Sequence, residues 1–157
     1  IDCPGYGRSP GDRQTIRSYP GAFLSDVVSS LGKSRAYAVV GSSQGACAVM
    51  NALLEVPLLA WHVAVCHPVG HDVARYTRIR QPALLLFDGD DTGHPIDVGR
   101  RMHKALPTSY WFEFRASEQP CWLQEHMATK LLAMFADPRN RRLLSEVSGP
   151  RSGAPPP

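Results

Sequence analysis

The sequence predicts an α/β fold in which a parallel sheet of about four strands carries helices on both faces. Two observations predict it. Short apolar runs of strand length recur along the chain, and segments with apolar residues at helical spacing lie between them. This alternation is typical of parallel strands joined by right-handed helical crossovers.

Each element is expected from its own local pattern. A Gly- and Pro-rich loop runs to about Pro20, and apolar residues then recur every three or four positions until Gly32 ends the helix. Strands are expected over residues 35–40, 61–66, 83–87 and 110–114, and helices over residues 23–31, 44–54, 97–106 and 125–135.

Composition bounds the remaining possibilities. The chain has 157 residues, of which 43% are hydrophobic, so one domain is expected over residues 1–135. The pattern fades into a Pro-rich segment over residues 136–157, which is predicted to be a flexible tail. A formal charge of +3 without a dense basic patch argues against nucleic-acid binding, and no apolar run is long enough for a membrane helix. Four widely spaced cysteines favour a reducing, cytoplasmic location.

A Gly-x-Ser-x-Gly pentapeptide, residues 41–45, falls where a predicted strand meets a predicted helix. In that context the motif is typical of a sharp turn that exposes a nucleophilic serine, here Ser43, at the carboxyl end of a sheet. The backbone amide of Gln44 would then begin the helix and stabilise an oxyanion. The alternative is a Gly/Ser turn that only caps the helix.

Other sites are less well supported by the sequence. The glycine turn lacks the lysine of a phosphate-binding loop and the spacing of a dinucleotide loop, so no nucleotide or other cofactor is expected. His67 and His71 have a spacing that zinc sites use on helices, but Pro68 and Gly70 argue against a helix there. No metal is expected, and these histidines are assigned to a loop at the mouth of the pocket.

Three stretches together resemble the alpha/beta-hydrolase fold family. They are the loop over residues 2–9, which reads Asp-Cys-Pro-Gly-Tyr-Gly-Arg-Ser, the turn around Ser43, and the acidic turn over residues 87–91. The segments 80–86 and 120–123 look like the small capless intracellular members of the interacting factor B type. The resemblance implies that the chain is the carboxyl-terminal portion of such a domain and an N-terminally incomplete copy.

The resemblance also implies the acid and base positions of a catalytic triad. Asp91, 48 residues after the serine, aligns with the family's acid and is preferred over Asp88 and Asp90. Gln119 occupies the position of the family's histidine, and an amide cannot accept the serine proton. His94 is a less favoured surrogate base, and His126 is assigned to the surface of the last helix.

These residues predict a serine hydrolase that acts on a small ester, thioester or amide through an acyl-enzyme, with a compromised base. A non-catalytic protein of the same fold, which binds a ligand or a protein partner, is the alternative. Ser43 and Asp91 are expected at one sheet edge, within reach of one bridging side chain, and Gln119 is expected between them.

Overall fold

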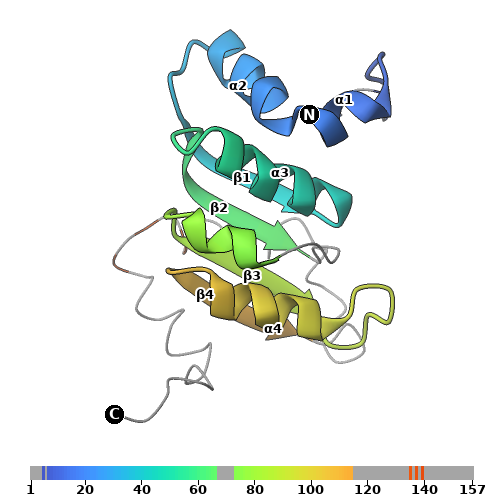
Figure 1. The fold of residues 1–157 in the computed structure, drawn as a ribbon, viewed down its shortest axis with the longest axis vertical. Coiled ribbons are helices and arrows are strands. Elements are labelled where there is room, and N and C mark those ends of the chain that lie inside the picture. The colour runs from blue at the N-terminus through green and yellow to red at the C-terminus, as the bar shows by residue number, and fades with distance from the viewer. Residues whose placement is uncertain are drawn as a thin grey trace.

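Four parallel strands form one sheet in the order β1-β2-β3-β4 (Figure 1). The computed structural model describes residues 5, 7–66, 73–114, 135, 137 and 139. The strands are β1 (Ala36–Ser42), β2 (Ala60–Cys66), β3 (Ala83–Asp88) and β4 (Ser109–Phe114). Each lies within two residues of its predicted bounds, so the predicted parallel sheet is confirmed.

The helices between the strands are α3 (Gln44–Glu55), the short 3-10 helix η1 (Val73–Arg78) and α4 (Ile96–Ala105). Before the sheet, α2 (Pro20–Ser30) packs on α3, and the backbone amide of Gly21 donates a 2.8 Å hydrogen bond to Glu55 Oε2. The last predicted helix, residues 125–135, lies outside the described residues except for Phe135.

The larger core lies between the sheet and the helices α3 and α4, which cover the same face in Figure 1. All six residues of β3 are buried, as expected for a strand in the interior of a parallel sheet. A smaller core on the other face joins Leu84 and Leu86 of β3 to Phe135. Apolar residues therefore pack on both faces of the sheet.

The segment predicted as a loop up to about Pro20 contains a helix, α1 (Arg13–Ser18). The carboxylate of Asp12 accepts a 2.9 Å hydrogen bond from the amide of Gln14 and so supports the first turn. The prediction of an unstructured loop is wrong there because the segment has one apolar residue to bury, Ile16, and one such residue gives no helical period.

The longest described helix, α3, has 12 residues, and a membrane-spanning helix needs about 20. In the part of the chain that the structure describes, no helix has the length and hydrophobicity to cross a membrane. The predicted tail, apart from residues 137 and 139, lies outside the described residues.

Candidate active site

Ser43 lies in the turn between β1 and α3. Its φ of 52° and ψ of −119° place it in a backbone region that residues other than glycine rarely adopt. Among the described residues, Ser43 is the one non-glycine residue with a positive φ. Such strain costs on the order of 1–3 kcal/mol and persists where surrounding contacts enforce it. The strand thus passes into the helix at a sharp corner, with the serine at its apex.

Close backbone approach explains the glycine at position 41. A Cβ added to Gly41 would lie 2.6 Å from the carbonyl carbon of Gly45 and 2.8 Å from the amide nitrogen of Ala46, both shorter than real Cβ contacts. The end of β1 therefore lies directly against the first turn of α3. Within the described structure, a Cβ added to Gly45 meets no atom within 4 Å, so the two glycines of the motif are not equivalent.

Asp91 lies in the loop that follows β3, at the same carboxyl edge of the sheet as Ser43. Its Oδ1 accepts hydrogen bonds from the backbone amides of Gly93, at 2.8 Å, and His94, at 3.2 Å. This turn fixes the carboxylate and folds the chain back, so that the side chain of His94 comes beside it. The other carboxylate oxygen, Oδ2, faces the imidazole.

His94 joins the serine to the carboxylate. Its Nδ1 lies 2.7 Å from Asp91 Oδ2, and its Nε2 lies 2.9 Å from Ser43 Oγ. An ionised carboxylate can only accept a hydrogen bond, so Nδ1 carries the proton of a neutral ring and Nε2 accepts from the serine hydroxyl. The three side chains therefore form a continuous chain of hydrogen bonds with the direction that base activation of a serine requires.

The three side chains are partly exposed to solvent. The side chains of His94 and Asp91 are 24% and 28% exposed, and Ser43 is half-buried. Gln44 is the first residue of α3, so its backbone N–H lies at the positive end of the helix dipole, next to the serine. A serine, a histidine, a carboxylate and a helix amino terminus thus meet at one sheet edge.

The family resemblance predicts Gln119 between Ser43 and Asp91, whereas the hydrogen bonds to both residues are made by His94. Gln119 lies outside the described residues, as do His126, His67 and His71. The assignment of Gln119 to the family's base position stays a prediction. The sequence does contain a signal for His94. Residues 91–94 read Asp-x-Gly-His, between a predicted strand and a proline, and this pattern is typical of a turn in which the aspartate side chain accepts hydrogen bonds from the following backbone amides.

No protein-family model matches the sequence, and no curated protein matches it. Solved structures do match. A CIB-like hydrolase from Thermoplasma acidophilum superposes with a TM-score of 0.72 at 20% identity, over 88% of this chain and 69% of that chain.

Two further solved structures are similar. A monoacylglycerol lipase from Paleococcus ferrophilus has a TM-score of 0.69 at 17% identity, over 86% of this chain and 81% of that chain. The esterase RhEst1 from Rhodococcus sp. ECU1013 has a TM-score of 0.65 at 10% identity, over 85% and 77%. At these identities the similarity establishes the fold, which is that of the alpha/beta hydrolases.

Proposed function

We propose that this protein is a serine hydrolase that cleaves a small ester, thioester or amide, with Ser43 as nucleophile, His94 as general base and Asp91 as the carboxylate that orients the base. The observation that carries the proposal is the unbroken chain of hydrogen bonds from Ser43 Oγ through both ring nitrogens of His94 to Asp91 Oδ2. The hydrolase fold supports the same chemistry, and two of the similar structures are named as a lipase and an esterase.

The proposed reaction has two halves. Ser43 Oγ attacks the acyl carbonyl while its proton passes to His94 Nε2, and the oxyanion that forms accepts a hydrogen bond from the backbone amide of Gln44. His94 then gives the proton to the leaving group, which departs and leaves an acyl-enzyme on Ser43. In the second half, His94 takes a proton from water as the water oxygen attacks the acyl carbon. His94 then gives that proton to Ser43 Oγ as the bond between Oγ and the acyl carbon breaks, which releases the acid and restores the serine hydroxyl.

This proposal changes the role of one residue. The family resemblance predicts a compromised base, because Gln119 occupies the position at which the family carries histidine. With His94 as the base, a histidine at position 119 is not needed for proton transfer. The alternative function, a non-catalytic protein that binds a ligand or a protein partner, is favoured by Gln119 alone and predicts an unactivated serine.

Labelling by a fluorophosphonate, followed by intact mass measurement, separates the two functions, because the probe reacts with a serine only when a base activates it. We expect wild-type protein to be labelled at Ser43 and to hydrolyse p-nitrophenyl acetate. Replacing His94 with Ala should lower both rates by about 10²–10⁴, the usual contribution of a general base.

A second histidine offers a matched control. His103 Nδ1 lies 2.7 Å from Ser109 Oγ, and this hydroxyl donates a 3.1 Å hydrogen bond to the backbone carbonyl of His103. Ser109 is buried, so this histidine and serine form a structural contact. His103→Ala should leave labelling of Ser43 unchanged once folding is verified by circular dichroism. If H94A is labelled as fast as wild type, or if Gln119→Ala abolishes labelling while H94A does not, the role assigned to His94 is refuted.

A further inference from the structure

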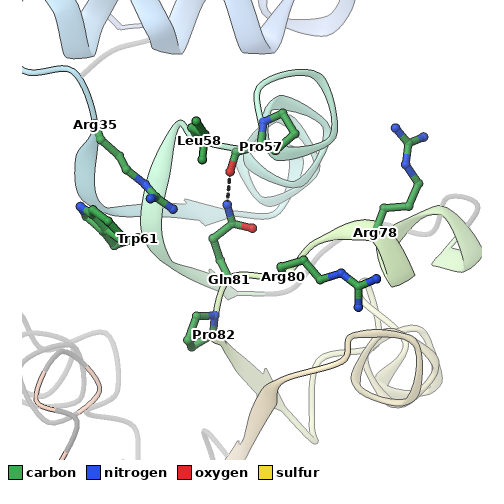
Figure 2. A pocket seen from close by; sticks show the side chains of 8 residues that line it. All are labelled: Arg35, Pro57, Leu58, Trp61, Arg78, Arg80, Gln81 and Pro82. Carbon is green, nitrogen blue, oxygen red and sulfur yellow. Dashed lines mark hydrogen bonds between the residues drawn. The ribbon is translucent and has the colours of Figure 1, made fainter.

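A hollow opens at the edge of the sheet where the strands begin, opposite the candidate active site (Figure 2). Its volume is about 370 Å³, and the side chains of Leu58 and Trp61 in its wall are 70% and 55% exposed. Pro57, just after α3, and Pro82, just before β3, complete its apolar part. Large apolar side chains left open together in one hollow are typical of a surface that binds another chain segment or molecule. We call this apolar part the Trp61 hollow.

The walls of the Trp61 hollow are held in place by contacts between several elements. The guanidinium of Arg35 stacks on the ring of Trp61, 3.6 Å from the ring centroid, and one terminal nitrogen donates a 2.8 Å hydrogen bond to the carbonyl of Ala60. The side-chain amide of Gln81 donates to the carbonyl of Pro57, which ties the end of α3 to the start of β3. Because these contacts are already formed, the hollow loses little conformational entropy when a ligand binds.

The chemistry of the Trp61 hollow favours an uncharged ligand that has apolar groups and a hydrogen-bond acceptor. Arg78 and Arg80 line one end, but their guanidinium groups point away from Trp61 in Figure 2. The indole N–H of Trp61 donates to no residue in the described part of the chain, so it can donate to a carbonyl of a ligand. An exposed aromatic ring with such a donor beside it is typical of grooves that bind proline-rich segments.

This chain contains a segment with the required chemistry. Its one run of consecutive prolines is at residues 155–157, and Ser-Gly-Ala precedes it at residues 152–154. Consecutive prolines favour the polyproline II helix, whose carbonyls have no internal hydrogen bonds and can accept from a groove. None of the side chains in residues 152–157 is charged, which matches the apolar wall of the hollow.

The segment is within reach of the hollow. The ring centroid of Phe135 lies 5.5 Å from that of His62 and 5.8 Å from that of Tyr110. These two residues lie near the beginnings of β2 and β4, and His62 directly follows Trp61, so Phe135 is close to the same edge of the sheet as the hollow. The 19 positions from Phe135 to Ala154 span up to about 59 Å as polyproline II chain. This is more than twice the length of β2, whose seven residues span about 23 Å.

We propose that residues 152–157 of this chain dock in the Trp61 hollow as a polyproline II segment. The proline rings lie against the side chains of Trp61 and Leu58, and the Trp61 indole donates to a carbonyl of the segment. Arg35 and Ser43 lie at opposite ends of β1, and eight residues of extended chain span about 26 Å. Docking therefore leaves the Ser43 relay untouched, and the proposal holds whether or not the protein is a hydrolase.

The NMR signals of the tryptophan indole N–H groups test this docking in the full chain. The chain has three tryptophans, and the signal of Trp61 is the one that Trp61→Phe removes. The triple variant Pro155→Ser/Pro156→Ser/Pro157→Ser should shift this signal, because the indole loses its acceptor and the proline rings beside it. The shift should be the same at all protein concentrations, since the segment and the hollow belong to one molecule.

The control for the triple proline variant is Ser145→Gly/Ser148→Gly. It adds backbone freedom to the same carboxyl-terminal part of the chain but keeps all three prolines. The Trp61 signal should stay at its wild-type position in this variant. Fluorophosphonate labelling of Ser43 should proceed at the wild-type rate in both variants, which separates a loss of docking from a loss of the hydrolase site.

A synthetic peptide with the sequence of residues 150–157 provides a second test. If the segment is docked in about two-thirds of molecules, wild type should bind the peptide about threefold more weakly than the triple proline variant does. In the triple-variant background, Leu58→Asp should weaken peptide binding at least tenfold. Leu31→Asp, at a residue outside the hollow that is 68% exposed, should keep peptide binding within twofold.

Three results would overturn the proposal. The first is a Trp61 signal that stays at its wild-type position in the triple proline variant. The second is equal affinity of wild type and this variant for the peptide. The third is a difference between the two Trp61 signals that grows with protein concentration, which would assign the docked segment to a second copy of the chain.

Discussion

Adding one methyl group to each glycine of the serine turn should have opposite effects on stability. The Cβ of Gly41→Ala would lie 2.6 Å and 2.8 Å from backbone atoms of Gly45 and Ala46, whereas ordinary contacts are 3.4 Å or longer. The chain must move by most of an ångström to accommodate it, and the atoms in the way are backbone at the start of a helix. We expect the free energy of unfolding to fall by about 3 kcal/mol, the upper end for an overpacked site.

Gly45→Ala is the matched control, since the same methyl group added there meets no described atom within 4 Å. Gly45 is helical, so alanine should raise the free energy of unfolding by about 0.5 kcal/mol through its better helix propensity. Both values can be measured by urea denaturation followed by circular dichroism.

Fluorophosphonate labelling of the same two variants tests whether the turn positions the nucleophile. Gly41→Ala should slow labelling even without urea, where the variant is folded. To accommodate the added Cβ, the turn must move away from α3, and this movement displaces Ser43 Oγ from His94 Nε2. The reasoning is refuted if Gly41→Ala unfolds within 0.5 kcal/mol of wild type, a margin below which surface substitutions usually fall. It is also refuted if Gly45→Ala is the more destabilising of the two.

Two further predictions concern the carboxylate and the core. Asp91→Asn should lower kcat for p-nitrophenyl acetate by about 10³ or more, because an amide can donate to Nδ1 and then stabilises the wrong tautomer of His94. Asp97→Asn, which changes an exposed carboxylate on α4, is the control. Equal activity of the two variants would contradict the role assigned to Asp91. Gly99→Ala should destabilise the protein by about 2–3 kcal/mol, because its Cβ would overlap the buried ring of Phe87, which stacks on Trp111 at 4.7 Å. An unchanged urea midpoint for Gly99→Ala would show that Phe87 can shift at little cost.

The fold was predictable because strands and helices here have clear and different apolar periods. The run Ala83 to Phe87 is apolar at every position, and all of β3 is buried, as a central parallel strand requires. The helix α1 was not predictable in the same way, because it is short and buries one apolar residue, Ile16. Its start depends on the side chain of Asp12, which is a local hydrogen bond and leaves no periodic signal.

The candidate site was predictable in part. Ser43 and Asp91 each follow a predicted strand, and parallel strands bring such residues to one edge of a sheet. Which histidine meets them depends on the path of the loop after β3, and a family pattern that expects the base after the last strand ranks His94 low. The local hydrogen bonds from Gly93 and His94 to Asp91 Oδ1 fix that path. The contact between His94 and Ser43 joins residues 51 positions apart, and spacing alone does not predict it.

The closeness of Asp91 and His94 in the sequence affects how the relay can be assembled. The two are three positions apart, and the serine is 51 positions before the histidine. Only two segments of the chain, one with Ser43 and one with both Asp91 and His94, therefore have to come together. If the histidine lay on a third segment, one more loop would have to close. Closing a loop of three residues orders very few backbone angles, so little conformational entropy is lost when Asp91 and His94 come together. The turn's own hydrogen bonds to Asp91 Oδ1 offset much of that loss. The loop after β3 sets the position of His94, the proposed base. We therefore expect sequence changes beyond β4 to leave that position unchanged.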